Sequence, residues 1–167
     1  MEISIIKDDE IEETSKLIEK TARTCFVDYY PQKEIDKVCE SLNYEGVKKR
    51  ASWTHFYVIK ENKKIIACGA IGSYWGSETE SSLFTIFVDP DYQGNGYGRK
   101  IIETLENDEY FLRAKRIEIP AGMVAIPFYK RMGYDFKNGE LIYSDGHFAM
   151  EKFNPNWKYY LTYDFNL

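Results

Sequence analysis

Three glycines in five residues, Gly94, Gly96 and Gly98, stand in the segment QGNGYG at residues 93–98. The segment follows an apolar run and precedes a run with helical spacing, so it joins a strand to a helix. Backbone amides at a helix start lack internal acceptors and lie at the positive end of the helix dipole. Glycines let these amides converge and remove the β-carbons that would keep an anion away. The spacing therefore predicts a phosphate cradle, although such a connection can also be only a tight turn.

Two common nucleotide-binding loops do not match this segment. A Walker A loop requires Lys followed by Ser or Thr after its glycines, and neither pair follows here. A dinucleotide fingerprint reads G-x-G-x-x-G near the start of a βαβ unit, whereas this segment reads G-x-G-x-G after four expected strands. If the loop holds a phosphate, it therefore does so as neither a Walker A loop nor a dinucleotide fingerprint.

Periodicity indicates the elements that must position this loop. Strands are expected at residues 2–6, 55–61, 65–75, 83–88, 116–120, 134–136 and 148–153. A tight turn is expected at the NKK segment, residues 62–64, and a polar loop at 76–82. Helices are expected at about residues 11–26, 32–42, 43–52, 98–109 and 124–133. The strand-helix-strand order around the glycine loop predicts a parallel strand pair joined by a right-handed crossover. We predict a single α+β domain over residues 1–167, with a core at about 2–153 and an aromatic C-terminal extension at 154–167.

The chain has 167 residues, enough for one packed domain, and a formal net charge of −5. This acidic balance argues against a nucleic-acid partner, because phosphate binding depends on clustered Lys and Arg. It favours a cationic small molecule or a basic peptide as the partner.

Cys25, Cys39 and Cys68 are odd in number and lie far apart, with no CxxC pair. This spacing predicts neither a disulfide framework nor a zinc site, and we expect no metal. Each cysteine reads as a small buried hydrophobic residue, with a reactive thiol as the alternative. The segment MEISIIKDDE lacks the pattern of a signal peptide, and no apolar run is long enough to span a membrane. We therefore expect a cytoplasmic protein with no membrane partner.

Two motifs together resemble the GNAT superfamily of N-acetyltransferases. The acetyl-CoA signature Gln/Arg-x-x-Gly-x-Gly/Ala is matched by Gln93, Gly96 and Gly98, in the setting VDPDYQ. The segment AIPFYKRMGY at 125–134 is similar to the family's helix with Ala-x-x-Phe-Tyr-x-x-x-Gly-Phe/Tyr. Both motifs occur in the family's order and separation, and the resemblance covers about residues 2–153.

The resemblance implies a mixed, mostly antiparallel sheet of about seven strands, in which the parallel strands at 83–88 and 116–120 splay apart at a bulge. The backbone of the first of these strands would then pair with the pantetheine arm of acetyl-CoA, as an extended peptide adds to a sheet edge. The residues implied to bind acetyl-CoA are Ile86, Phe87, Val88, Gln93, Gly94, Asn95, Gly96, Tyr97, Gly98 and Arg99. Lys100, Arg113, Lys115 and Arg116 add positive charge that could serve the phosphates of CoA, or they form a solvated face.

The resemblance also implies catalytic roles. Tyr129 matches the tyrosine that protonates the departing thiolate of CoA in many relatives, although a tyrosine there could also only pack on the sheet. Glu118 lies near the position of the base in some relatives, with His55 and His147 as alternatives. Many relatives have Asn or Arg seven residues before the tyrosine, where this chain has Gly122, which weakens any role for that loop.

The implied reaction is direct attack on the thioester by a primary amine in a ternary complex, with no covalent enzyme intermediate. The acceptor, a small molecule or a peptide, is expected to be cationic, because Asp28, Tyr29, Tyr30 and Glu34 would wall its pocket. An alternative is a non-catalytic acyl-CoA-binding or sensing module, and a third is a mononucleotide-binding protein that shares only the loop. The aromatic extension also makes a homodimer an expectation.

Overall fold

The computed structural model describes residues 1–157 of the chain. Its strands are β1 (Glu2–Ile5), β2 (His55–Glu61), β3 (Lys64–Ser73), β4 (Glu80–Val88), β5 (Arg116–Ala121), β6 (Asp135–Phe136), β7 (Tyr143–Ser144) and β8 (His147–Phe153). Its α-helices are α1 (Ile11–Cys25), α2 (Gln32–Ser41), α3 (Tyr44–Trp53), α4 (Tyr97–Glu106), α5 (Glu109–Leu112) and α6 (Ile126–Arg131). Short 3-10 helices are η1 (Asp8–Glu10), η2 (Pro90–Tyr92), η3 (Met123–Ala125) and η4 (Lys137–Gly139). Most of the predicted aromatic extension, residues 158–167, lies outside the described residues.

The strands form one sheet in the order β1-β2-β3-β4-β5-β8-β6, and β7 pairs with β8. β4 and β5 are parallel, whereas β1 is antiparallel to β2, and β5, β6 and β7 are antiparallel to β8. The predicted mixed sheet with one parallel pair is confirmed. It has eight strands rather than about seven, because the two-residue strand β7 precedes the last one.

The chain divides into two compact units. The first consists of Met1–Ala70 and Thr85–Ile102, and the second of Ile71–Phe84 and Glu103–Leu167. The elements β3, β4 and α4 therefore contribute residues to both units. That residues 1–167 behave as a single domain stays a prediction.

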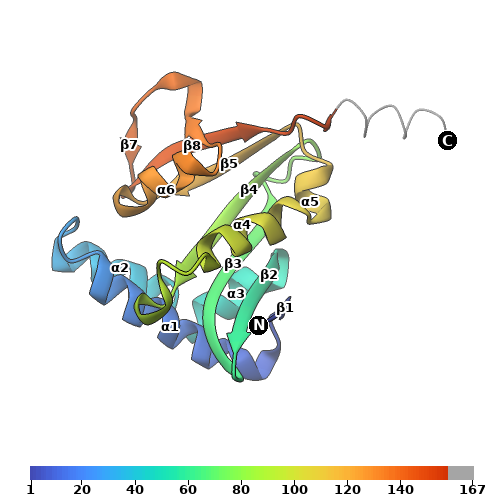
Figure 1. Ribbon diagram of the computed structural model, residues 1–167. Helices are drawn as coiled ribbons and strands as arrows, with labels where there is room; N and C mark the ends of the chain where they lie inside the picture. The colour runs from blue at the N-terminus through green and yellow to red at the C-terminus, as the bar shows by residue number, and fades with distance from the viewer. Residues whose placement is uncertain (158–167) are drawn as a thin grey trace. The chain divides into compact units, whose positions relative to one another are not determined.

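In the first unit, the long helix α1 has the apolar stripe that the sequence indicates. Ile11, Leu17, Ile18 and Ala22 are buried along one side, as expected of an amphipathic helix. α1 packs against α2 and α3, and α3 packs against β2. Figure 1 shows α3 behind β2 and β3, and the first turns of α4 in front of them. Because helices cover both faces, β3 is buried along nearly its whole length rather than at alternate residues.

The predicted tight turn between β2 and β3 is confirmed. Asn62 and Lys63 both have positive φ, +48° and +68°, the conformation that lets a two-residue turn match the twist of its strands. The turn ends β2 at Glu61, whose carboxylate accepts a hydrogen bond of 3.0 Å from the hydroxyl of Tyr97. This bond ties the start of α4 to the hairpin.

The strand β4 begins at Glu80, three residues before the start that the sequence predicts. The polar loop expected over 76–82 is therefore shorter and ends before Glu80. Ser81 and Ser82 are buried because their hydroxyl groups find acceptors in the protein. The Ser81 hydroxyl donates to the carbonyl of Tyr110 at 2.7 Å, and the Ser82 hydroxyl donates to the carbonyl of Glu118 at 3.0 Å. A serine whose hydroxyl is satisfied in this way can occupy a buried strand.

The helix predicted over residues 98–109 is two helices in the structure. α4 ends at Glu106, and α5 begins at Glu109 after Asp108, whose carboxylate accepts a hydrogen bond of 2.8 Å from the amide of Tyr110. An aspartate in this position satisfies an otherwise unpaired amide and starts a new helix. Apolar spacing alone cannot distinguish this restart from a continuous helix.

The second unit contains an ion-pair cluster centred on Arg116 at the start of β5. Its guanidinium lies 3.2 Å from a carboxylate oxygen of Glu80, 2.9 Å from Glu118 and 3.3 Å from Glu151. The Arg116 side chain is only 10% exposed. Hydrogen bonding to Arg116 outweighs burial and lowers the pKa of Glu80. The cluster joins β4, β5 and β8 of this unit through charge.

Replacing Arg116 with methionine is expected to lower the free energy of unfolding by about 2 kcal/mol at neutral pH, because it leaves partly buried carboxylates uncompensated. The pKa of Glu80 is lower in the folded protein than in the unfolded chain, so its ion pair with Arg116 stabilises the fold above the usual glutamate pKa of about 4.3. This stabilisation is lost as the pH falls below that value. The loss caused by the substitution should therefore shrink in acid. Urea unfolding of both proteins across this pH range measures it.

The matched control is Lys16→Met. Lys16 lies 3.3 Å from Glu12 in an ion pair whose side chains are 73% and 71% exposed. An exposed pair of this kind contributes less than about 1 kcal/mol, so the control should unfold nearly like the parent. Equal losses for the two variants would show that the Arg116 cluster does not stabilise the second unit.

Candidate functional site

The glycine-rich loop has the backbone conformation that its sequence predicts. Gly94 and Gly96 have φ of +78° and +85°, a left-handed conformation that residues with a β-carbon seldom adopt. A β-carbon built on either glycine would meet no atom within 4 Å. The glycines are therefore needed for the path of the chain, and the space beside them is open.

The backbone amides of this loop have no acceptor among the described residues. Within residues 1–157, the first helical amide here with a backbone acceptor is that of Lys100, which donates to the carbonyl of Gly96 at 3.0 Å. The amides from Gly94 to Arg99 donate to no described residue. Unpaired amides at a helix N-terminus bind anions, and glycines on the same loop let a phosphate approach them. The geometry is therefore suited to a diphosphate, and its binding by the loop stays a prediction.

Three of the predicted binding residues use their side chains to build the loop. The Asn95 amide group donates to the carbonyls of Tyr92 and Gln93 at 3.1 and 3.2 Å. The Gln93 amide group donates to the carbonyl of Val88 at 3.0 Å, which ties the loop to the end of β4. The Tyr97 hydroxyl is bonded to Glu61, as described above. For these residues the backbone, rather than the side chain, is available to a ligand.

Asp89 anchors the loop, although the sequence did not single it out. It is 2% exposed, and its carboxylate accepts hydrogen bonds of 2.9 Å from both the Asp91 amide and the Lys20 ammonium. Lys64 approaches it at 3.4 Å. Burial alone would raise the pKa of Asp89, but the bonds from Lys20 and Asp91 outweigh it and lower the pKa. The Asp-Pro pair after a strand is a local turn signal that could have indicated this anchor.

The end of β4 has an edge without a partner. The parallel register between β4 and β5 covers only three residue pairs, the last being Ser82 with Glu118. Beyond it, Thr85 has φ of +56°, the kind of irregularity that interrupts a strand ladder. Along the described strands, residues 86–88 have no register partner on β5. Ile86, Phe87 and Val88 therefore lie beyond the last register pair, and the splay of the two strands at a bulge stays a prediction.

The basic residues considered in the sequence analysis differ in what they contact. Arg99 is exposed and, within the described chain, forms no ion pair. Arg113 donates to the hydroxyl of Ser73 at 2.7 Å and lies over the ring of Tyr110. Lys115 lies 5.5 Å from the ring centroid of Trp157, and Arg116 is held in its ion-pair cluster. Arg99 directly follows the loop in the chain, whereas Arg113, Lys115 and Arg116 belong to the second unit.

Tyr129 lies on α6 and is 6% exposed. Its ring packs against Phe128 and Tyr134, with centroids 5.5 and 6.3 Å apart. Burial raises the pKa of Tyr129, and no hydrogen bond contributes to that shift. A phenol that stays protonated and has no acceptor among residues 1–157 can donate its proton to a ligand atom.

Glu118, the predicted base, is engaged by two cations. Its carboxylate lies 2.9 Å from both the Arg116 guanidinium and the Lys137 ammonium, and its side chain is 14% exposed. The alternatives His55 and His147 stand at the first residues of β2 and β8. The loop, residues 86–88 and Arg99 belong to the first unit, whereas Tyr129 and Glu118 belong to the second. The base stays a prediction.

Comparison with known proteins adds to this geometry. A sequence model of the acetyltransferase (GNAT) family matches residues 16–134, which include the glycine loop and the motif around Tyr129. The chain belongs to the GNAT family. The resemblance of both motifs and the predicted fold are thereby confirmed.

Two solved GNAT structures show the same fold at low identity. The PaiA N-acetyltransferase of Thermoplasma acidophilum, in complex with coenzyme A, has a TM-score of 0.78 and 13% identity, over 92% of this chain and 98% of that chain. The N-acetylglutamate synthase of Neisseria gonorrhoeae, complexed with coenzyme A and N-acetyl-glutamate, has a TM-score of 0.66 and 12% identity, over 91% of this chain and 34% of that chain. At identities this low, the similarity shows that the fold is shared.

A curated relative is described as an uncharacterized N-acetyltransferase of Methanocaldococcus jannaschii. It is 34% identical over 91 residues, which cover 49% of this chain and 39% of the relative. The chain thus matches well under half the length of that protein. Within residues 1–157, no cluster of His, Cys, Asp and Glu is arranged to hold a metal ion, and no helix is long and apolar enough to cross a membrane.

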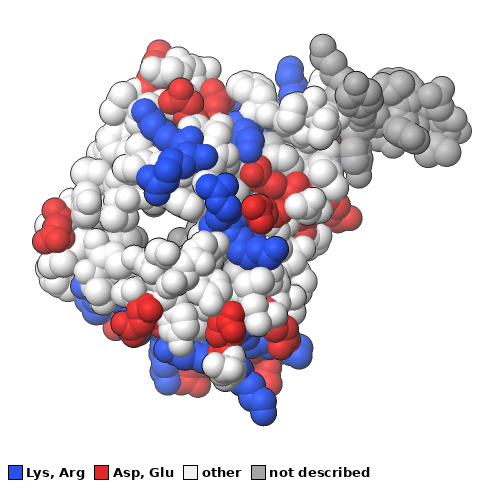
Figure 2. Space-filling view, in the orientation of Figure 1, with Lys and Arg blue, Asp and Glu red and all other residues white. Residues whose placement is uncertain are grey.

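The GNAT chain carries local positive charge despite its net charge of −5. Figure 2 shows Lys and Arg side chains gathered over α6, the helix that contains Lys130 and Arg131. The net negative charge, from which we expected a cationic partner, therefore does not describe every part of the surface.

Proposed function

We propose that the protein is an acetyl-CoA-dependent N-acetyltransferase whose acceptor is a primary amine. The observation that carries the proposal is the set of unpaired amides from Gly94 to Arg99, in a family whose members of known structure include complexes with coenzyme A. Acetyl-CoA supplies an activated acetyl thioester. The residues present fit it, because a diphosphate needs several converging donors and open space beside them.

We assign the binding of the acyl donor to two parts of the first unit. The amides from Gly94 to Arg99 hold the diphosphate, and the Arg99 side chain adds a charge-assisted contact. The backbone of residues 86–88 has no register partner on β5, although the Val88 carbonyl already accepts a bond from Gln93, and it pairs with the amide groups of the pantetheine arm as a strand edge pairs with a peptide. Backbone recognition of this kind orients the thioester without side chains of particular identity.

The chemistry we propose is direct aminolysis. The neutral amine of the acceptor attacks the thioester carbonyl, a C–N bond forms, and the C–S bond breaks. The amine gives up a proton to a base, for which Glu118 is the candidate, and the Tyr129 hydroxyl donates a proton to the leaving sulfur. The acceptor is an ammonium ion in solution, so the base must also remove the proton that keeps it unreactive.

Turnover tests the proposal. The protein is incubated with acetyl-CoA and a panel of primary amines, and free thiol release is followed together with the acetylated product by mass spectrometry. Acceptor-dependent thiol release with matching acetylated product is expected. Thiol release without an acceptor would indicate only thioester hydrolysis.

A second candidate function is a non-catalytic acyl-CoA-binding module. The ion pairs of Glu118 with Arg116 and Lys137 favour it, because both cations already contact Oε1 of this carboxylate, which would otherwise be available to an amine. Calorimetry separates the two candidates. Coenzyme A binding together with no turnover of any amine would support the binding module.

A further inference from the structure

Thr85, in the strand β4 of the first unit, has an unusual backbone conformation. Its φ is +56°, a value that a β-branched residue seldom adopts because its side chain is crowded by its own backbone. Among the non-glycine residues of the described chain with positive φ, Thr85 is the only β-branched one and the only one within a strand. A residue of this kind keeps its conformation only where its surroundings fix it, and such residues gather at functional sites.

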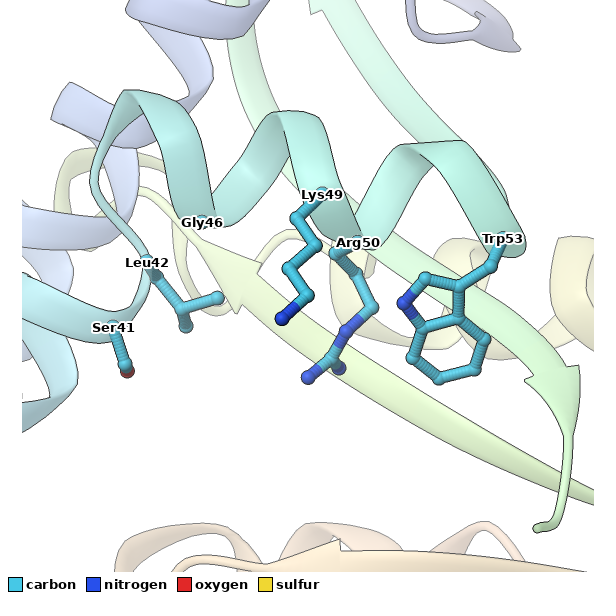
Figure 3. Close-up of a pocket in the computed structure, with 6 residues that line it drawn as sticks. All are labelled: Ser41, Leu42, Gly46, Lys49, Arg50 and Trp53. Carbon is cyan, nitrogen blue, oxygen red and sulfur yellow. The ribbon is translucent and has the colours of Figure 1, made fainter.

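Two side chains from other elements hold Thr85 in place. The thiol of Cys68, on β3, donates to the Thr85 carbonyl at 3.3 Å. Cys68 is fully buried, and burial raises the pKa of Cys68 to about 12, so the thiol keeps the proton that it donates. Figure 3 shows the Arg50 side chain extending from α3 toward β4, and its guanidinium donates to the Thr85 hydroxyl at 3.2 Å. The carbonyl and the hydroxyl of Thr85 are therefore both bonded.

The sulfur of Cys68 also fixes the direction of the next peptide groups. The backbone amide of Phe87 donates to this sulfur, and the Thr85 carbonyl accepts from it. In a trans peptide, the C=O of one residue and the N–H of the next point in opposite directions. The Ile86 amide is therefore directed away from Cys68, because it is opposite the Thr85 carbonyl. The Ile86 carbonyl is also directed away from Cys68, because it is opposite the Phe87 amide.

Ile86 begins the stretch that we assign to the pantetheine arm. Residues 86–88 have no register partner on β5 among the described strands, and the Val88 carbonyl already accepts from Gln93. A strand pairs with an extended neighbour through the N–H and the C=O of the same residue, which face one side. A ligand that carries amide groups can take the place of such a neighbour. Ile86 presents the pair of groups that this ligand requires.

We propose that Thr85 is a positioning residue for the acyl donor: held at positive φ by Cys68 and Arg50, it directs the N–H and the C=O of Ile86 toward the amide groups of the pantetheine arm. The inference rests on the proposed function, and it names the residue that orients the edge of β4. Thr85 acts through Ile86, so its side chain need not touch the substrate. The identity of its side chain should then matter for conformation rather than for shape.

Two substitutions separate conformation from shape. Thr85→Val keeps the shape and the β-branch but removes the hydroxyl that accepts from Arg50. It is expected to lower the affinity for coenzyme A at least about tenfold, as loss of one charge-assisted hydrogen bond would. Asparagine tolerates positive φ, and its side-chain oxygen can accept from Arg50, so Thr85→Asn should bind coenzyme A within about threefold of the parent. Its thermal midpoint should equal or exceed that of the parent. A packing role predicts the opposite order, since valine is closer to threonine in shape.

Two ligands locate the loss along the acyl donor. Calorimetry compares coenzyme A with phospho-ADP, the nucleotide half of coenzyme A, which keeps the diphosphate and lacks the pantetheine arm. Thr85→Val should bind phospho-ADP within about twofold of the parent, because separate sites contribute independently. The matched control is Thr14→Val. Thr14 is buried on α1, and its hydroxyl donates to the Glu10 carbonyl at 2.8 Å. This control should lose stability and bind both ligands like the parent.

Turnover is measured beside binding, so that the two proposals fail separately. If the parent acetylates no amine but coenzyme A affinity follows the expected order across the variants, the proposed function fails and the inference stands. The inference fails if Thr85→Val binds coenzyme A like the parent, or if Thr85→Asn binds it less tightly than Thr85→Val. It also fails if Thr85→Val loses affinity for both ligands equally. In each of these cases, acetylation of amines by the parent would keep the proposed function.

Discussion

Replacing Gly96 with valine is expected to lower the affinity for coenzyme A by at least about a hundredfold, the equivalent of one or two charge-assisted hydrogen bonds. Gly96 has φ of +85°, and a β-branched residue strongly disfavours that conformation. The open space around the position means that the effect comes from the backbone and not from a collision. When the backbone turns to relieve the strain, the amides from Gly94 to Arg99 no longer converge.

Gly76→Val is the matched control for this substitution. Gly76 has φ of +73°, and a β-carbon at this position would likewise meet no atom within 4 Å, but Gly76 lies in the turn before β4. Both variants should lose similar stability in thermal unfolding, and only Gly96→Val should lose affinity in calorimetry. Unchanged affinity in Gly96→Val would show that the loop does not hold the diphosphate.

Replacing Tyr129 with phenylalanine is expected to lower kcat by about a thousandfold, within the range for loss of a general acid. The hydroxyl is the only group removed, and hydrogen bonding makes no contribution to its pKa in the protein. The ring contacts with Phe128 and Tyr134 remain. Stability and coenzyme A affinity should therefore stay near those of the parent, and steady-state kinetics should place the loss in kcat.

The pH dependence of kcat gives a second measurement of the same role. Burial raises the pKa of Tyr129 above the usual tyrosine value of about 10, so the phenol keeps its proton to higher pH. A fall in kcat from loss of this proton is therefore expected only above about pH 10. An alkaline limb near pH 8 that disappears in Tyr129→Phe would contradict the buried, protonated acid.

Tyr134→Phe is the control for Tyr129→Phe. The Tyr134 hydroxyl is buried and has no hydrogen-bond partner among the described residues. Removing an unsatisfied hydroxyl should leave kcat unchanged and raise the free energy of unfolding by up to about 1 kcal/mol. If both variants lost kcat equally, packing at α6 and not proton donation would explain the effect.

Local features of this chain were predictable because they depend on neighbouring residues. The glycines of QGNGYG indicate a sharp bend of the backbone, and Gly94 and Gly96 form it with positive φ. The NKK segment indicates a tight turn, and Asn62 and Lys63 form it. In each case the conformation follows from which residues tolerate a given φ, a property that needs no distant partner.

Side-chain partners were not predictable, because they come from segments far apart in the sequence. The roles of Gln93 and Tyr97 in holding the loop depend on Val88 and on Glu61, and the buried anchor Asp89 depends on Lys20. The ion pairs of Glu118 and the buried serines at the start of β4 likewise required the strand pairing. The motif alone does not show whether a loop residue would contact a ligand through its backbone or through its side chain.

The sequence by itself determined the family, the mixed sheet and the sharp turn of the glycine loop, since each rests on short-range patterns of glycine, apolar and turn residues. Only the tertiary structure decided which groups surround each charge. It pairs Glu118 with Arg116 and Lys137, and it sets Arg50 beside the hydroxyl of Thr85 and the ring of Trp53. The interaction of a charge with its surroundings depends on distances between residues remote in the chain, and those distances exist only after folding.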